Sequence, residues 1–464
     1  MKEFQVVIIG SGPGGYVAAV RAGILGLKTA IIEKDPFLGG TCLHRGCIPT
    51  KALLHTAHLY DEFTHAGDQG IHAEGITVDF QAVHKHKSGI VDKFAKGVRF
   101  LMKKRKVEVF TGTGSLVDAN TVRITSGEGE ETIRGDAIIL ATGSVPSSLP
   151  HIKPDHKTIL DSDSILEYEQ IPKSLAVIGA GAVGVEFASI FNSFGTEVQV
   201  IEVLPRIVPI EDEEISKALD KAFRKKGIVV RTSCEVKKVK ATKTTAKLTV
   251  TTSGKEEEIS VEKVLLSVGR SAVTADVGLD KAGVKADERG YVHVNEFMQT
   301  NVPGIYAIGD IVRTPWLAHV ASAEGILAVD HIAGREAHPV NYDKVPNCTY
   351  CSPEVASVGL TEQKAKDAGY SVKVGQFPFS AIAKAMILGE TNGFIKIVGD
   401  EAYDEVLGVH IIGPKATELI AEACLGMKLE TTVKEIAKTV HAHPTLSEAM
   451  MEAAHSVYGE AIHI

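Results

Sequence analysis

The sequence predicts an α/β protein that contains two nucleotide-binding βαβ units, and three observations carry this prediction. Two stretches share one pattern: an apolar strand, a glycine-rich turn, an amphipathic helix and a second strand that ends in an acid. They span residues 5–34 and 174–203. The acid follows the first glycine of the turn by 23 positions in both, as Glu33 after Gly10 and Glu202 after Gly179. The chain of 464 residues is also too long for a single core and predicts roughly three domains.

The segments outside these two stretches predict an ordered series of elements. The first unit is followed by a helical stretch, a basic and partly amphipathic run, and strand-like segments that end in an apolar run at Gly143. A proline-rich linker leads into the second unit, and the later run GIYAIGD closes on Gly309 and Asp310. The last third predicts strands at 373–378, 394–398 and 406–411 and helices at 417–427 and 432–437.

Composition and charge set several partner classes aside. The net charge of −8 gives no bulk attraction to nucleic acid or to an anionic membrane. The chain enters the apolar run FQVVIIG directly, without the regions of a signal peptide, and no apolar run reaches the roughly 18 residues of a membrane span. We therefore expect a cytoplasmic protein with neither nucleic-acid nor membrane partners.

Each glycine turn has the residues that a dinucleotide site requires. In the first unit Gly10 permits the tight turn, Gly12 lets the backbone approach a pyrophosphate, and Gly15 lets the helix pack on the strand. The same places in the second unit are held by Gly179, Gly181 and Gly184. A turn that binds nothing is the alternative, but a strand, a helix and a correctly spaced acid accompany both turns.

Glu33 and Glu202 are predicted to accept hydrogen bonds from ribose hydroxyls, with a solvated strand end as the alternative. A 2′-phosphate would meet a like charge at Glu202, and Val203 and Leu204 supply no cation beside it. Arg206 is the only cation nearby. NAD(H) is therefore favoured over NADP(H).

A C-x4-C pair, Cys42 and Cys47, lies between the first unit and the next helix. Five residues turn an ideal helix by about 140°, whereas bonded cysteines need Cα atoms about 4.4–6.8 Å apart. We therefore expect Cys42 at a helix entrance, where its pKa is lowered, with Gly46 and Pro49 easing the turn. The alternatives for this pair are a zinc site, to which Cys348 and Cys351 could add two ligands, and two inert buried thiols. Cys234 and Cys424 are expected to be inert thiols of that kind.

Nine motifs in order along the chain resemble those of a known family. They are GSGPGG (10–15), GGTCLHRGCIPTK (39–51), ATGS (141–144), GAGAVGVEF (179–187), SVGR (267–270), YAIGD (306–310), LAHVASAEG (317–325), PEVASVG (353–359) and HAHPTLSE (441–448). Together they resemble the flavin-dependent pyridine nucleotide-disulfide oxidoreductases, and within them the enzymes that oxidise dihydrolipoamide. The resemblance implies one non-covalent FAD per chain, NAD⁺/NADH and a homodimer.

The resemblance also divides the chain into four regions. It implies two Rossmann-like domains that bind FAD and NAD, a central region that completes the FAD site, and a C-terminal α+β domain that forms the dimer interface. The expected regions are 1–148 (first part of the FAD domain), 149–271 (NAD domain), 272–344 (central) and 345–464 (interface).

Residue roles follow from the same resemblance. Cys42 is implied to be the thiol that meets the lipoyl disulfide, and Cys47 the thiol that makes the charge-transfer contact with the flavin. Lys51 would lie near the flavin N5 and pair with Glu186, although such an ion pair can be purely structural. Asp310 would bond the ribityl chain. Further implied cofactor contacts are Gly14, Gly114, Thr142 and Gly143, Ala318 and His319 at the pyrimidine end of the ring, Val203 and Gly269, and Arg270 bordering the NAD site.

The motif HAHPTLSE supplies the predicted base. Thiol–disulfide exchange needs a group that takes a proton from the incoming thiol, and a histidine held by a carboxylate suits that role. His443 precedes Pro444, and Glu448 lies five positions beyond His443, with His441 as the rival. In the family the second histidine of this motif acts across the dimer interface on the cysteines of the other subunit, which implies His443 here.

The expected reaction is oxidation of protein-bound dihydrolipoamide by NAD⁺, and other enzymes of the same scaffold are the alternatives. Glutathione reductase uses NADPH, which Glu202 opposes. Mercuric reductase carries a C-terminal cysteine pair, which the tail SVYGEAIHI lacks, and soluble transhydrogenase lacks the redox cysteines. A main role as a binding subunit is the remaining alternative.

The implied partners are the lipoyl domains and core subunits of 2-oxoacid dehydrogenase or glycine cleavage complexes. The basic run 93–106 is either a docking face for an acidic partner or a solvated helix face. Cys348 and Cys351, which the family does not require, are expected to serve packing.

Overall fold

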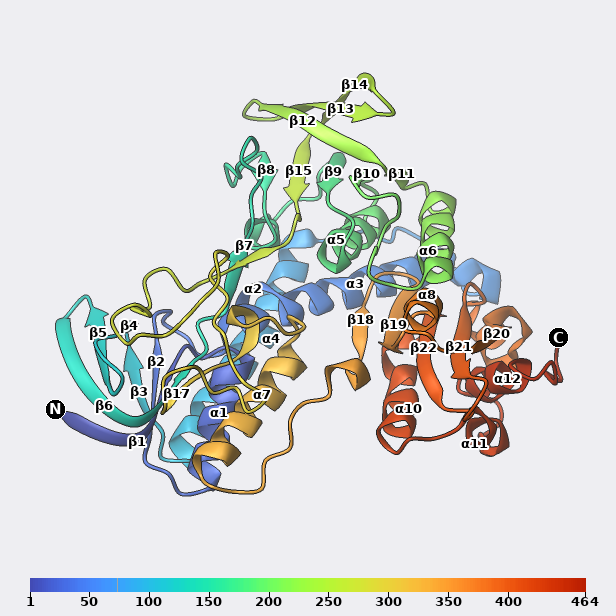
Figure 1. Ribbon diagram of the computed structural model, residues 1–464. Helices are drawn as coiled ribbons and strands as arrows, with labels where there is room; N and C mark the ends of the chain where they lie inside the picture. Colours follow the sequence, from blue (N-terminus) through green and yellow to red (C-terminus); the bar gives the residue numbers. More distant parts are fainter. Residues whose placement is uncertain (73) are drawn as a thin grey trace. The chain divides into compact units, whose positions relative to one another are not determined.

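The computed structural model describes residues 1–72 and 74–464, which form two compact units made of interleaved segments (Figure 1). Unit 1 comprises Met1–Ala52, Gln81–Ser147 and Arg270–Tyr342. Unit 2 comprises Leu53–Phe80, Ser148–Gly269 and Asp343–Ile464. No helix in the described ranges is long and apolar enough to cross a membrane. The division into four regions with separate roles stays a prediction.

A seven-stranded sheet forms the centre of unit 1, in the order β3-β2-β1-β6-β5-β4 with β17 beside β6. Its parallel strands are β1 (Lys2–Ile9), β2 (Thr29–Glu33), β3 (Glu108–Thr111), β6 (Gly129–Leu140) and β17 (Ile305–Ala307). Its antiparallel strands are β4 (Thr113–Leu116) and β5 (Thr121–Ser126). A separate ribbon pairs β7 (Ser144–Pro146) with β16 (Arg270–Ala272).

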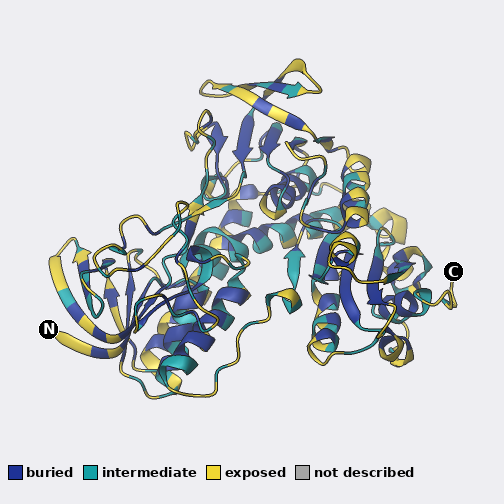
Figure 2. Ribbon diagram, viewed as in Figure 1, coloured by how far each residue is buried: buried dark blue, intermediate teal, exposed yellow. Residues whose placement is uncertain are grey.

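The first strand of unit 1 is apolar on both faces because both faces are covered. Val6 and Ile8 pack in a core shared with α1 (Pro13–Ile24), α4 (Phe80–Lys104) and α7 (Ala318–Ile332). Val7 and Ile9 pack in a second core on the opposite face. Val6, Val7, Ile8 and Ile9 are buried, and Figure 2 draws buried residues in dark blue.

The second βαβ unit is the centre of a parallel sheet in unit 2, in the order β11-β10-β9-β15-β8. The strands are β8 (Ile159–Leu160), β9 (Ser174–Ile178), β10 (Glu197–Ile201), β11 (Val229–Arg231) and β15 (Lys263–Leu266). The helix α5 (Ala182–Ser193) connects β9 to β10, and α6 (Glu213–Lys225) connects β10 to β11. An antiparallel sheet of β12 (Cys234–Ala241), β13 (Ala246–Thr252) and β14 (Lys255–Val261) shares a core with the parallel sheet.

The C-terminal part of unit 2 is an antiparallel sheet covered by helices, in the strand order β18-β19-β22-β21-β20. The strands are β18 (Asn347–Thr349), β19 (Glu354–Gly359), β20 (Val372–Pro378), β21 (Phe394–Asp400) and β22 (Val406–Gly413). The helices are α8 (Glu362–Asp367), α9 (Ala383–Leu388), α10 (Ala416–Lys428), α11 (Val433–Lys438) and α12 (Glu448–Ser456). Short 3₁₀ turns are η1 (Ala66–Gln69), η2 (Ser164–Glu167), η3 (Gly309–Ile311), η4 (Tyr342–Lys344) and η5 (Phe379–Ala381).

The observed elements confirm the α/β class, the two Rossmann-like units, and the three strands and two helices predicted for the last third. The basic run 93–106 lies mostly on α4, with Ala95, Val98 and Met102 buried and its lysines exposed. That arrangement is a helix with one core-facing stripe and a solvated basic face.

Candidate active site

The two acids at the ends of the βαβ units make the same pair of hydrogen bonds. Glu33 accepts the N–H of Ser11 on one carboxylate oxygen and the N–H of Asp35 on the other, both at 2.9 Å. Glu202 accepts the N–H of Ala180 at 2.7 Å and that of Leu204 at 2.9 Å. Each acid is 7% exposed and is fixed beside the helix start, where a ribose hydroxyl can donate to it.

The glycine turns leave the helix N-termini open while packing helix on strand. Gly12 and Gly181 are the N-caps of α1 and α5, no side chain caps either helix, and a Cβ on either glycine would meet nothing within 4 Å. By contrast, a Cβ on Gly15 or Gly184 would lie 1.9 or 2.0 Å from the carbonyl oxygen of the first glycine of its turn. Both turns therefore fit a pyrophosphate against free amides.

The cysteine segment lies directly on the first of these turns. A Cβ on Gly40 would approach the Gly12 Cα to 2.5 Å, and the Gly39 N–H donates to the Ser11 carbonyl at 3.1 Å. Here α2 (Gly40–Arg45) begins, and it carries Cys42 in its first turn. Cys42 therefore lies beside the predicted FAD turn, within unit 1.

A single glycine separates the two cysteine-bearing helices. Gly46 ends α2, and α3 (Cys47–His65) begins at the next residue, so Cys47 is also at a helix start. A Cβ on Gly46 would lie 3.0 Å from the Thr41 carbonyl and 3.3 Å from the Cys42 Cα, a tight approach that a bulkier residue would disturb. The break brings together two thiols that one continuous helix would hold apart.

The thiols of Cys42 and Cys47 hydrogen-bond to each other and are not joined in a disulfide. The hydrogen bond to Cys47, burial and the charge of Cys47 raise the pKa of Cys42, while nearby Lys51 lowers it. Expectation and structure differ here, because the helix entrance alone predicts a lowered pKa for Cys42.

Hydrogen bonds link β7, β16, η3 and α7 within unit 1. Ser144 donates through Oγ to Asp310 at 2.5 Å, and Arg270 donates to the Oγ and the carbonyl of Ser144 at 2.7 and 2.8 Å. The carboxylate of Glu324 on α7 accepts the Gly309 N–H at 2.7 Å. Sequence reasoning did not single out Ser144 or Glu324, although Ser144 follows Gly143 in a recognised motif and Glu324 is a fully buried acid.

The other predicted cofactor residues of unit 1 contact further elements of the same unit. A Cβ on Gly14 would come within 3.0 Å of the Ala321 carbonyl of α7, and Gly114 lies against Ile9 and Ile32. Thr142 donates through Oγ1 to the Val273 carbonyl at 2.6 Å, and the Gly143 carbonyl accepts the Val273 N–H at 2.9 Å. Ala318 and His319 open α7.

Unit 2 holds the remaining predicted residues. Val203 follows Glu202 and is 63% exposed, and Gly269 has a φ of +108°. Glu186 is buried on α5 and accepts the Tyr350 N–H at 2.9 Å. Lys51 belongs to unit 1 and Glu186 to unit 2, so their predicted pairing remains a prediction.

The geometry of the histidine motif separates its two histidines. The Nδ1 of His443 donates to Glu448 Oε1 at 2.9 Å, and its ring is 72% exposed. The second oxygen of Glu448 accepts the Thr445 N–H at 2.8 Å. Since a carboxylate only accepts, the neutral His443 ring offers Nε2 as its basic nitrogen.

His441 is placed differently from His443. Its two ring nitrogens lie 2.8 Å from Glu422 Oε1 and 2.8 Å from the Thr439 carbonyl, and its side chain is 5% exposed. The hydrogen bond to Glu422 raises the pKa of His441, against the effect of burial. His441 therefore suits a structural role, and His443 is the better candidate base.

The second cysteine pair is not arranged like the first. Cys351 is buried, its thiol donates to the Pro353 carbonyl at 3.3 Å, and burial raises its pKa. Cys348 lies on β18 and packs against the C-terminal core. No group of three or more metal-ligating side chains occurs in the described part of the chain.

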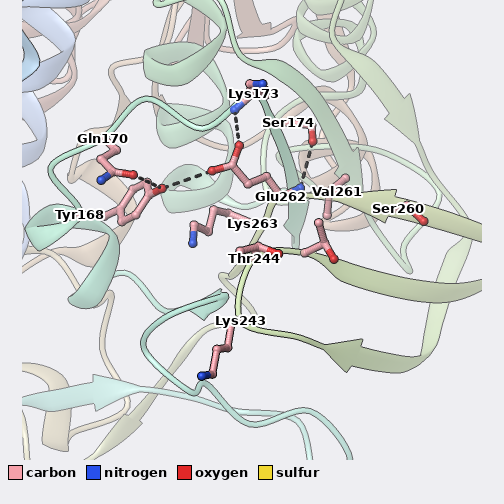
Figure 3. Close-up of a pocket in the computed structure, with 11 residues that line it drawn as sticks. Tyr168, Gln170, Lys173, Ser174, Lys243, Thr244, Ser260, Val261, Glu262 and Lys263 are labelled. Atoms are coloured by element: carbon pink, nitrogen blue, oxygen red, sulfur yellow. Dashed lines mark hydrogen bonds between the residues drawn. The ribbon is translucent and has the colours of Figure 1, made fainter.

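A hollow of about 600 Å³ lies at the end of the parallel unit 2 sheet opposite to the end that carries the glycine turn (Figure 3). Ser174 and Lys263, which line it, are the first residues of β9 and β15, whereas the turn follows the last residue of β9. Glu262 accepts the Lys173 N–H at 2.9 Å, and Lys263 donates to the Lys157 carbonyl at 2.9 Å. The hollow therefore lies outside the predicted nucleotide site.

Comparison with known proteins gives matches along nearly the whole chain. The family model for pyridine nucleotide-disulphide oxidoreductases matches residues 4–325, and that for their dimerisation domain matches residues 345–454. A dihydrolipoyl dehydrogenase of Bacillus subtilis is 46% identical, with 99% of each chain covered. A mitochondrial dihydrolipoyl dehydrogenase of Pisum sativum is 43% identical over 100% of this chain and 93% of its own. The crystal structure of LpdA from Mycobacterium tuberculosis matches with a TM-score of 0.91 at 26% identity, covering 98% of this chain and 99% of that one.

We predict that Gly184→Ala destabilises the protein by about 1–3 kcal/mol, because the new Cβ would clash with the Gly179 carbonyl. Gly181→Ala is the matched control, since its Cβ meets nothing within 4 Å. Denaturant unfolding of both variants measures the difference. Equal stability of the two would contradict the packing role of Gly184.

Proposed function

The chain belongs to the pyridine nucleotide-disulphide oxidoreductase family, and from this premise we propose that it acts as a dihydrolipoyl dehydrogenase. The reaction is dihydrolipoamide + NAD⁺ → lipoamide + NADH + H⁺. The observation that carries the proposal is the thiol pair Cys42 and Cys47, which lies beside the glycine turn of unit 1 because α2, the helix of Cys42, begins on that turn. Relatives that are 46% and 43% identical over the full chain bear this enzyme name.

The two βαβ units hold the two dinucleotides in this proposal. The open amides after Gly12 and the fixed carboxylate of Glu33 suit FAD in unit 1, with Asp310 for the ribityl chain. Gly181 and Glu202 suit NAD⁺ in unit 2. When bound, FAD accepts the electron pair of the thiols and delivers it to NAD⁺ as hydride.

The chain's own residues carry out the thiol–disulfide exchange. Starting from the Cys42–Cys47 disulfide, His443 Nε2 takes a proton from one substrate thiol, and the resulting thiolate attacks the Cys42 sulfur. The Cys42–Cys47 bond breaks and Cys47 leaves as the thiolate. The second substrate thiol then displaces Cys42 from the mixed disulfide, which releases lipoamide; its proton passes to Cys42, while His443 holds the proton taken in the first step.

The base and the thiol pair come from different copies of the chain in this proposal. Residues 345–454 match the dimerisation model, and they contain His443 and Glu448. A homodimer therefore completes each site with the histidine of the other copy. The lipoyl domains and core subunits of 2-oxoacid dehydrogenase or glycine cleavage complexes are the proposed partners that present the substrate.

The proposal predicts a long-wavelength absorption band when the FAD-loaded protein takes up two electrons without oxygen. Cys47→Ser removes the thiolate next to the flavin, so the band is lost while the flavin content is retained. Cys424→Ser, outside the site, is the control and keeps the band. Absence of the band in the unmodified protein would overturn the proposal.

We also expect NADH to be used far more efficiently than NADPH. The buried carboxylate of Glu202 repels a 2′-phosphate, a like-charge effect that is worth about 10-fold or more in kcat/KM. Steady-state rates of lipoamide reduction with each nucleotide measure the ratio. Equal efficiency would refute this role of Glu202.

Glu448→Gln is expected to slow flavin reduction by dihydrolipoamide by about 10- to 100-fold, because His443 loses the carboxylate that orients it and stabilises its charged form. Glu422→Gln, which alters the partner of His441 instead, is the matched control and leaves this rate within about twofold. Anaerobic stopped-flow absorbance gives both rates. A larger loss in the control would assign the base to His441.

A further inference from the structure

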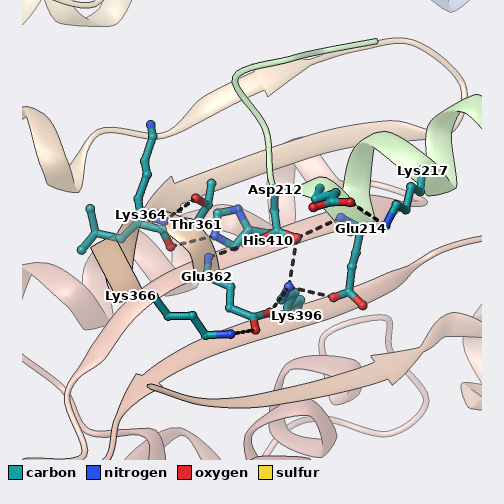
Figure 4. Close-up of polar contacts among 11 residues, drawn as sticks. Asp212, Glu214, Lys217, Thr361, Glu362, Lys364, Lys366, Lys396 and His410 are labelled. Carbon is teal, nitrogen blue, oxygen red and sulfur yellow. Dashed lines mark hydrogen bonds and ion pairs between the residues drawn. The ribbon is translucent and has the colours of Figure 1, made fainter. Parts of the chain in front are cut away.

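A buried lysine on the C-terminal sheet collects three carboxylates (Figure 4). Lys396 lies on β21 and is 1% exposed. Its ammonium lies 3.0 Å from Asp212 Oδ1, 2.7 Å from Glu214 Oε2 and 2.7 Å from Glu362 Oε2. Asp212 and Glu214 belong to the start of α6, whereas Glu362 opens α8. The cluster thus ties α6, next to the predicted NAD site, to the C-terminal sheet.

Lys396 is the cation that balances Asp212. Burial acts against the charged lysine, but the three carboxylates raise its pKa. Burial also acts against the charged Asp212, and the hydrogen bond from Lys396 lowers its pKa. The neighbouring His410 is fully buried, and burial lowers its pKa, so it stays neutral. Removing Lys396 would leave Asp212 buried without its counter-ion.

From Asp212 a series of hydrogen bonds continues toward the glycine turn. Asp212 is the N-cap of α6 and accepts the Glu214 N–H at 3.1 Å. One turn into this helix, Ser216 donates through Oγ to the Ile207 carbonyl at 2.6 Å. Val208, the residue after Ile207, donates its N–H to the Ala180 carbonyl at 2.8 Å. The segment between Glu202 and α6 is therefore held at both ends.

Ala180 is the residue on which this series meets the predicted NAD site. Its carbonyl receives the N–H of Val208, and its own N–H donates to Glu202 at 2.7 Å. Ala180 lies between Gly179 and Gly181 in the turn. A shift of α6 would therefore move the peptide that supports the ribose-binding acid and the pyrophosphate amides.

We propose that Lys396 is a positioning residue for the nicotinamide dinucleotide, acting through Asp212, Ser216 and Val208 on the glycine turn. The inference rests on the proposed function in one respect, that unit 2 binds NAD(H). Lys396 touches neither the dinucleotide nor the reacting thiols in this scheme. Its loss weakens nucleotide binding and leaves the thiol chemistry of unit 1 intact.

The test uses the FAD-loaded full chain and three changes. Lys396→Met removes the charge, and Lys396→Gln is a milder form for the case that the first does not fold. Ser216→Ala breaks the next link without altering any charge. Glu362→Gln is the matched control, because it weakens the same ion cluster from α8 rather than from α6.

Two readouts separate nucleotide binding from thiol chemistry. The dissociation constant for NADH is measured by equilibrium titration, and flavin reduction by dihydrolipoamide is measured without any nucleotide. The Lys396 and Ser216 variants are expected to bind NADH about 3- to 10-fold more weakly, with the flavin reduction rate unchanged. Thermal unfolding of each variant reports general destabilisation separately.

Three results would overturn the inference. They are unchanged NADH affinity in a folded Lys396 variant, an equal loss of affinity in Glu362→Gln, and a parallel fall in flavin reduction. Failure of the proposed function has a different signature. In that case the unmodified protein itself shows no flavin reduction by dihydrolipoamide, while the NADH titration still decides the role of Lys396.

Discussion

Both dinucleotide-binding units depend on one hydrogen bond. In each, the backbone amide that follows the first glycine of the turn donates to the acid at the end of the second strand. It appears as Ser11 to Glu33 in unit 1 and as Ala180 to Glu202 in unit 2. The bond closes the strand–turn–helix unit, buries the acid and leaves the next amides of the helix start open. A chain that moves electrons between two dinucleotides needs this arrangement twice. Here the amide-to-carboxylate bond recurs in both units, with the Ser11 hydroxyl as an additional donor to Glu33 in unit 1.

In unit 1 the thiols of Cys42 and Cys47 lie beside the strand–turn–helix arrangement. Gly46 interrupts what would otherwise be one helix, so both thiols lie at helix starts and hydrogen-bond to each other. The hydrogen bond to Cys47 and burial raise the pKa of Cys42, while Lys51 opposes that change. Two thiols held within hydrogen-bonding reach of each other suit dithiol–disulfide exchange.

Local patterns predicted a great deal of this molecule, and long-range contacts account for what was missed. The equal spacing of Glu33 and Glu202 predicted equal geometry, and the apolar patterning of the last third located three of its strands and two of its helices. The roles of Ser144 and Glu324 depend on partners 166 and 15 positions away, which no local pattern reveals. The ion cluster of Lys396 joins residues 184 positions apart, and in sequence this lysine is simply one polar residue in an apolar strand.

The two βαβ units differ in the segment that follows the acid and leads back to the glycine turn. In both copies the residue six positions after the acid donates its N–H to the carbonyl of the second turn residue, Gly39 to Ser11 and Val208 to Ala180. In unit 1 the segment continues at once into α2 and the cysteines, so the same contact that closes the turn also places the reactive thiol beside it. In unit 2 the segment runs on to Asp212 and the buried ammonium of Lys396. A buried ion pair adds little net stability compared with apolar packing, but its strict geometry fixes one arrangement of the elements it joins. Under the proposed function, the shared contact supports thiol chemistry in unit 1 and the placement of NAD(H) in unit 2.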